Sequence, residues 1–365
     1  MLTLFAALAV QAPPAPVVPL AVVPPAHDPV LTVTVDSTTN EVVVRAGPFE
    51  LPAPGGGGHQ HEGGAMDMNA GGGHDHSQHV RTPVMRIDWP VEGWMRGFSF
   101  TLTEPDGTKI PSEILHHFVA VNFERRQLVY PVVERLFAVG QETESLLLPP
   151  IIGVPLTKGN DLGFYAMWAN TLGRDLEVNL ELRIPFLPSD APPRFEVLPL
   201  YLDVNNVIGE TSTFDLLPGV STHSWEFTVP TAVTVLAVGG HLHDYGSWVR
   251  LEDAETGEVL VQVNAERDEA GHVLGVERKE LINGPGLRLE PGKRYRIVGA
   301  YDNPTDEAFP EGAMAHLMGI VVPDDPAAWP SIDPSNRWYQ LDLAGLPEGE
   351  IRPEPAAAPA DGGGR

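Results

Sequence analysis

Short runs of alternating apolar and polar residues recur along this chain. The clearest are Leu31 to Val35, Glu41 to Arg45 and Leu176 to Ile184. Successive side chains of a strand point to opposite faces, so this period of two predicts strands that are buried on one face. Turn-forming sequences such as Pro105 to Gly107 bound the runs, and helix-period runs are scarce. The pattern predicts an all-β sandwich architecture.

Length and composition divide the chain into segments. At 365 residues it exceeds the usual size of one domain, so two domains are expected. The expected organisation is a signal-like segment and Pro-rich linker at 1–27, a first β-sandwich domain at 28–188 with a His/Gly-rich insertion at 55–79, a linker at 189–194, a second β-sandwich domain at 195–323, and a Pro/Gly-rich tail at 324–365 that lies on the surface or is disordered.

The net charge and the N-terminal sequence limit the expected partners and the expected location of the protein. The net charge of −26 argues against nucleic acid and anionic membrane surfaces as partners. The absence of cysteine excludes thiolate metal sites and disulfides. Residues Met1 to Ala12 are apolar with a small-residue end, as in a secretory signal peptide, but lack a basic start. A periplasmic or secreted protein without a membrane span is therefore expected.

Two motifs place metal-ligand side chains on expected strands of the second domain. One contains His241 and His243, and the other contains Met314, His316 and Met318. Alternate residues of a strand share a face, so each set projects together. If the strands are close, His241, His243 and Met314 can meet at one metal, with His316 and Met318 as further candidates. Imidazole with thioether favours copper. The alternative is an ordinary core strand with packed methionine and two outward histidines.

Two further groups of histidines add to this signal. His116 and His117 are adjacent, so in a regular strand they point to opposite faces and share a metal only at a twist or a strand end. The alternative is one exposed and one core histidine. The glycine-rich insertion could capture metal loosely or leave its histidines without a role. Its candidates are His59, His61, His74, His76 and His79.

The order of these motifs resembles the copper type II ascorbate-dependent monooxygenases, such as peptidylglycine α-hydroxylating monooxygenase and dopamine β-monooxygenase. The resemblance covers roughly residues 85–323 and includes the His pair, the His-x-His, and a Met after Tyr301 to Pro304. It implies two antiparallel β-sandwiches (jelly-roll-like) in tandem, copper as cofactor, ascorbate or another small reductant, O₂ and a small-molecule substrate. It assigns His241, His243 and Met314 to an oxygen-activating copper, and the His pair to an electron-relaying one.

The chain departs from this family at both implied copper sites. A third histidine is expected between Gly163 and Thr171, where Trp168 or Ala169 stands instead, and a histidine of the insertion could replace it. The arginine that precedes the His-x-His of peptidylglycine enzymes is Gly239 here, so an amidating substrate is not expected. Three hypotheses follow: a monooxygenase of unknown substrate, a copper-binding protein that has lost the electron-transfer site, and an adhesion or structural protein with incidental histidines.

Overall fold

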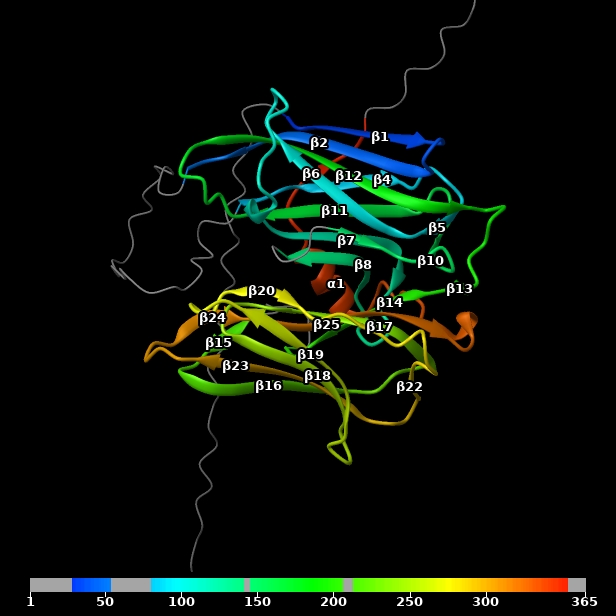
Figure 1. Ribbon diagram of the computed structural model, residues 1–365. Coiled ribbons are helices and arrows are strands. Elements are labelled where there is room, and N and C mark those ends of the chain that lie inside the picture. The colour runs from blue at the N-terminus through cyan, green and yellow to red at the C-terminus, as the bar shows by residue number, and fades with distance from the viewer. Residues whose placement is uncertain (1–27, 54–79, 141–144, 206–212, 354–365) are drawn as a thin grey trace, which may run out of the picture.

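The computed structural model describes residues 28–53, 80–140, 145–205 and 213–353. The insertion 55–79 with its five candidate histidines and the signal-like segment 1–27 lie outside the described residues. The chain is all-β and forms two antiparallel sandwiches, one above the other in Figure 1. Among the described residues the only α-helix is α1 (Arg337–Ala344). No helix in this part of the chain is long and apolar enough to cross a membrane.

The first domain packs two sheets around one core. The predicted alternation is realised in β12, where Leu176, Val178 and Leu180 are buried and the residues between them are partly or fully exposed. One sheet joins β1 (Val30–Asp36), β2 (Glu41–Leu51), β12 (Leu176–Pro188), β5 (Gly93–Met95), β10 (Ile152–Leu156) and β13 (Phe195–Glu196), with β6 (Gly97–Thr103) and β9 (Ser145–Leu147) at its side. The other joins β26 (Glu350–Ile351), β4 (Val84–Asp88), β11 (Asp161–Trp168), β7 (Leu115–Arg126) and β8 (Val133–Gly140), with β3 (Val80–Arg81) on β11.

The second domain repeats this two-layer plan. Its inner sheet joins β14 (Leu198–Asp203), β25 (Ala315–Pro323), β17 (Val233–Leu242) and β21 (Lys279–Glu280), with β22 (Leu287–Leu289) on β17. Its outer sheet joins β16 (Gly219–Phe227), β23 (Tyr295–Asn303), β18 (Gly246–Asp253), β19 (Val259–Arg267) and β20 (Val273–Val276). A small ribbon pairs β15 (Phe214–Leu216) with β24 (Phe309–Ala313). Short 3-10 helices stand at Ser112–Ile114 and Pro326–Ala328.

The two cores meet in a contact between the domains. In chain order, Val197 packs in the first core and Leu198 in the second, and Phe195 and Glu196 still pair with β10 of the first domain, so the change of domain falls a few residues after the expected linker at 189–194. Leu128, from the connection between β7 and β8, packs in the second core, and Leu236 of β17 packs in the first. Burial of apolar side chains from each domain in the other's core fixes how the sandwiches dock.

The inner sheet of the second domain is buried on both faces. Alternate residues of β14 and β25, such as Leu200 and Leu317, pack in the second core. The residues between them lie on the face toward the first domain, where Ile320 packs against the first core. Alternation of the strand pattern therefore places one set of side chains in the core and the other at the interface between the domains.

The expected tail at 324–365 is ordered over its described part. Residues 324–353, here called the C-terminal strap, run back to the first domain, and α1 lies between the two sandwiches in Figure 1. Strand β26 pairs in parallel with β4, so the strap extends a sheet of the first domain. The Trp329 indole donates a hydrogen bond to the Arg126 carbonyl at 3.0 Å. Of the two expected alternatives, disorder does not describe residues 324–353, because these long-range contacts offset the turn-forming composition.

Candidate metal centre

A β-bulge at the start of β7 directs both members of the His pair to one place. Met167 of β11 pairs with His117, whereas the next residue, Trp168, pairs with Leu115, so His116 is the extra residue. A bulge breaks the strict alternation of side chains and re-aims the residue that it adds. The two imidazole rings consequently lie side by side, with centroids 4.2 Å apart. This irregularity removes the difficulty that two adjacent histidines pose in a regular strand.

The second pair stands at the end of β17. Val238 and Leu242 face the core of the second domain, so His241, which alternates with them, faces the first domain. His243 follows in the turn between β17 and β18, and the ring centroids of His241 and His243 are 5.3 Å apart. Both side chains are almost completely buried.

The two pairs meet across the interface between the domains. Ligand nitrogens of His116, His117 and His243 all lie within 4.8 Å of one another. The ring of His241 lies 5.0 Å from that of His117, so a fourth imidazole flanks the group. The resemblance implies two separate copper sites, whereas this arrangement brings members of both histidine pairs into one cluster.

The spacing of these nitrogens fits a first-row transition metal. Imidazole nitrogens bind such ions at about 2.0–2.1 Å, which places tetrahedral ligands roughly 3.3 Å apart. Nitrogens already within 4.8 Å reach that spacing by small side-chain rotations. His116, His117 and His243 therefore form a candidate metal centre. These three residues and the neighbouring His241 are together called the interdomain histidine cluster.

Met314 directly precedes β25, the strand that pairs with β17. The register pairs His241 with His316 and Leu242 with Ala315, and His243 and Met314 are the next residues beyond this last pair. Met314 is buried between β24 and β25. The amides of His243 and Met314 donate to the same Tyr301 hydroxyl, so the Met314 backbone lies near the interdomain histidine cluster, and a thioether ligand here stays a prediction.

His316 and Met318 contact a different set of side chains. The His316 Nε2 atom lies 2.9 Å from Asp203 Oδ2 and 3.1 Å from the Tyr201 hydroxyl. Met318 packs beside Tyr201 in a small cluster with Tyr130 and Val132. The His316 ring is 5.7 Å from that of His241, next to the histidine cluster but turned toward Asp203. These two candidate ligands are therefore held in a neighbouring polar network.

This network also crosses the interface. The Tyr130 hydroxyl, from the first domain, donates to the Asp203 carbonyl at 3.2 Å and accepts from the Asp203 amide at 2.9 Å. Burial, with the nearby Asp203 carboxylate, raises the pKa of Tyr130 and that of Tyr201. Both hydroxyls consequently remain protonated hydrogen-bonding groups in neutral solution. Sequence reasoning missed Asp203 and both tyrosines, because the Tyr201–Asp203 pair acquires its role only through Tyr130 and His316, which lie far away in the sequence.

The place expected for a third histidine is filled by packing. Trp168 is fully buried, with its ring 6.1 Å from that of Phe49, and the Ala169 amide donates to the Ile114 carbonyl at 2.8 Å. Neither side chain can ligate a metal. Among the described residues, the additional histidine nearest in role is His243, which comes from the other domain.

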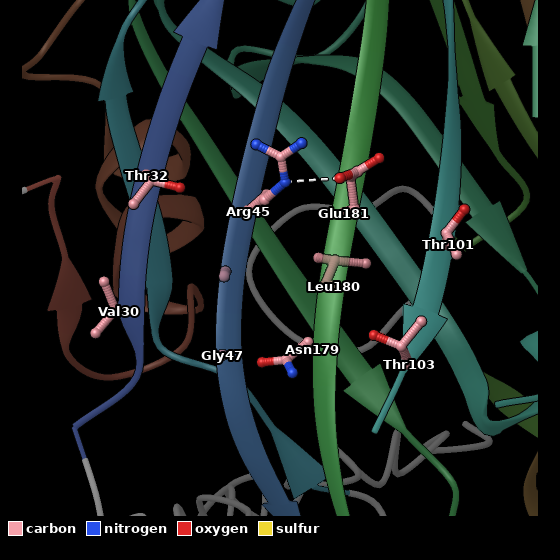
Figure 2. A pocket seen from close by; sticks show the side chains of 10 residues that line it. Val30, Thr32, Arg45, Gly47, Thr101, Thr103, Asn179, Leu180 and Glu181 are labelled. Atoms are coloured by element: carbon pink, nitrogen blue, oxygen red, sulfur yellow. Dashed lines mark hydrogen bonds and ion pairs between the residues drawn. The ribbon is translucent and has the colours of Figure 1, made fainter. Parts of the chain in front are cut away.

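A separate hollow of about 420 Å³ lies on the first domain, and no histidine is among its lining residues. Figure 2 shows it over β1, β2, β12 and β6, with Arg45 paired to Glu181 at 2.6 Å. This sheet face points away from the second domain in Figure 1. Its threonines and half-exposed ion pair form an ordinary solvated strand surface.

Comparison with known proteins adds little to this geometry. No family model matches the chain, and no curated protein matches it. Solved structures that match include the major capsid protein P2 from bacteriophage PM2, with 9% identity over 68% of this chain and 99% of that one at a TM-score of 0.32. Sulfolobus Turreted Icosahedral Virus (9%, 67% and 59%, TM-score 0.17) and the Sputnik virophage (9%, 80% and 94%, TM-score 0.21) also match. At these scores the likeness carries no information on function.

Proposed function

We propose that this protein binds copper between its two sandwiches, with the interdomain histidine cluster as ligands. The observation that carries the proposal is the convergence of His116, His117 and His243 within 4.8 Å, with His241 beside them. Imidazole is a common ligand of first-row transition metals, and ligands must lie close together to share one ion.

Copper is preferred over other metals because of the donor types near the site. Imidazole alone suits zinc, copper, iron and nickel, whereas a thioether selects copper in its reduced state. Met314 comes directly before Ala315, the last residue of the register with β17, and would supply that soft atom. Copper bound here would supply one-electron redox chemistry. The protein itself would exclude water and orient the rings.

Holding copper is favoured over using it for catalysis. Catalytic metal sites keep one position open, whereas sites closed by four protein ligands are structural. The three imidazoles and one further protein donor, His241 or Met314, would fill a tetrahedral site. A monooxygenase remains the second candidate, because the group of three leaves a fourth position for O₂ and because the motif order resembles that enzyme family. Ascorbate and a small organic substrate would then be partners.

The test removes one ligand from each domain. His117→Ala and His243→Ala should each weaken Cu(I) binding by at least roughly tenfold, measured by competition with a chromogenic chelator, since even indirect changes near a metal cost about 10–100-fold. His272→Ala is the matched control, because His272 is exposed and bonded to Asp268 at 2.9 Å. The proposal fails if either ligand variant binds copper as tightly as the wild type, or if Zn²⁺ displaces Cu(I) at equal concentration.

Oxygen consumption separates the two candidate functions. With copper loaded and ascorbate present, a copper-holding protein should consume O₂ no faster than its His117→Ala variant. Uptake that depends on His117 would instead establish the monooxygenase. A periplasmic or secreted location belongs to the proposal, because Met1 to Ala12 are signal-like. Cell fractionation tests that location.

A further inference from the structure

One buried hydroxyl group touches the backbone of two residues at the candidate centre. Tyr301, near the end of β23, accepts a hydrogen bond from the His243 amide at 3.2 Å and from the Met314 amide at 3.0 Å. It also donates to the Met314 carbonyl. A tyrosine hydroxyl offers one donor and two acceptor positions, so this group is fully used.

The arrangement links segments far apart in sequence. His243 follows β17, Met314 precedes β25, and Tyr301 comes from the outer sheet behind them. The Tyr301 ring is fully buried and meets that of Phe214 edge-on at 5.7 Å. The hydroxyl is thereby fixed in position by the core.

We propose that Tyr301 is the positioning residue of this centre, which sets His243 and Met314 at the distance that a shared metal requires. The inference rests on the proposed function. Without the hydroxyl, two amides and one carbonyl lose a partner, and the turn after β17 can move away from the Met314 segment. Its effect on the metal passes through the backbone, so Tyr301 is not itself a ligand.

Tyr301→Phe tests this inference, and Tyr295→Phe is the matched control. Tyr295 lies on the same strand, is equally buried, and its hydroxyl accepts from the Glu290 amide at 2.7 Å, at the other end of the strand. Both variants lose a buried hydroxyl. We expect Tyr301→Phe to weaken Cu(I) binding by about 10–100-fold, the range for groups that orient metal ligands. Tyr295→Phe should leave it within about twofold, although both lower the melting temperature.

The spectrum of Cu(II) provides a second readout. The copper hyperfine splitting in electron paramagnetic resonance should change in Tyr301→Phe and match the wild type in Tyr295→Phe. A purely structural role would alter melting alone in both variants. Equal Cu(I) affinity and equal spectra for Tyr301→Phe and wild type overturn the inference. Failure of the wild type to bind copper through His117 and His243 overturns the proposed function instead.

The hydrogen bonds can also be tested on metal-free wild type, in case Tyr301→Phe does not fold. The His243 amide precedes a turn and the Met314 amide lies between two strands, so each would exchange quickly without a partner. Protection of both against hydrogen exchange in nuclear magnetic resonance spectra is expected. Rapid exchange at either amide would show that Tyr301 does not hold that segment, and would overturn the inference.

Discussion

The buried ion pair between the C-terminal strap and the first domain yields a measurable prediction. The Asp342 carboxylate on α1 accepts from the Val133 amide at 2.9 Å and from Arg135 Nη1 at 2.8 Å, with a second bond from Arg135 Nη2. The side chains of Arg135 and Asp342 are only 12% and 4% exposed. Asp342→Ala should therefore leave the buried Arg135 guanidinium and the buried Val133 amide without this carboxylate as a partner.

The magnitude follows from that burial. Removing one partner of a buried ion pair costs about 3–5 kcal/mol, because the remaining charge keeps its desolvation penalty. Asp324→Ala is the control within the same strap: Asp324 pairs with Arg288, but these side chains are 49% and 41% exposed. An exposed pair contributes about 0–1 kcal/mol. Both variants remove one carboxylate from an ion pair, so the difference between their losses in free energy of unfolding reports the effect of burial.

Urea unfolding followed by tryptophan fluorescence and circular dichroism measures both variants. With a slope of about 1–3 kcal/mol per M, Asp342→Ala should lower the midpoint of the transition of the first domain by roughly 1 M or more. Replacing both partners, with Arg135→Met and Asp342→Leu, should recover most of the loss. The reasoning is refuted if Asp342→Ala and Asp324→Ala lose the same stability, or if the double replacement is worse than Asp342→Ala.

Two further predictions concern β17 and the buried tyrosines. Gly240→Ala should lower the free energy of unfolding by about 1–3 kcal/mol through overpacking, because the added Cβ would lie 2.8 Å from a Val249 methyl. Gly239→Ala should be nearly neutral, because the atom nearest to its added Cβ is 3.6 Å away. Equal melting temperatures of the two variants would contradict this. Burial raises the pKa of Tyr130, Tyr201 and Tyr301, so the unfolded chain loses these protons first. The contribution of these tyrosines to stability should be constant below pH about 10 and fall above it, by up to about 1.4 kcal/mol per pH unit for each tyrosine. Tyrosinate absorbance that rises fully before the circular dichroism changes would refute the burial argument.

The strands were predictable because their signal is local. The alternation from Leu176 to Ile184 states which face is buried, and β12 follows it. The strap was not predictable, because α1 and β26 are stabilised by Arg135 and by β4, which lie far back in the sequence. Composition near a chain end reports local propensity and carries no information on such partners.

Some features of the candidate site were likewise predictable from the sequence, and others were not. Motifs pointed to His116, His117, His241 and His243, because histidine spacing on strands is visible in sequence. Their gathering into one cluster depends on the bulge at His116 and on docking of the two domains, and neither leaves a local pattern. The contacts of Tyr301 run to backbone atoms, which every residue type supplies. A sequence therefore cannot mark which residues such a hydroxyl will join.

The strap also has a consequence for the order in which the protein matures during synthesis. Translation delivers the first sandwich early, but β4 receives its parallel neighbour β26 only when Glu350 and Ile351 leave the ribosome. Until then one edge of that sheet lacks a partner, and an open edge can pair with other chains. The first domain is thus synthesised first but completed last. A stop codon shortly before Glu350 would leave β4, in the N-terminal domain, without its parallel neighbour.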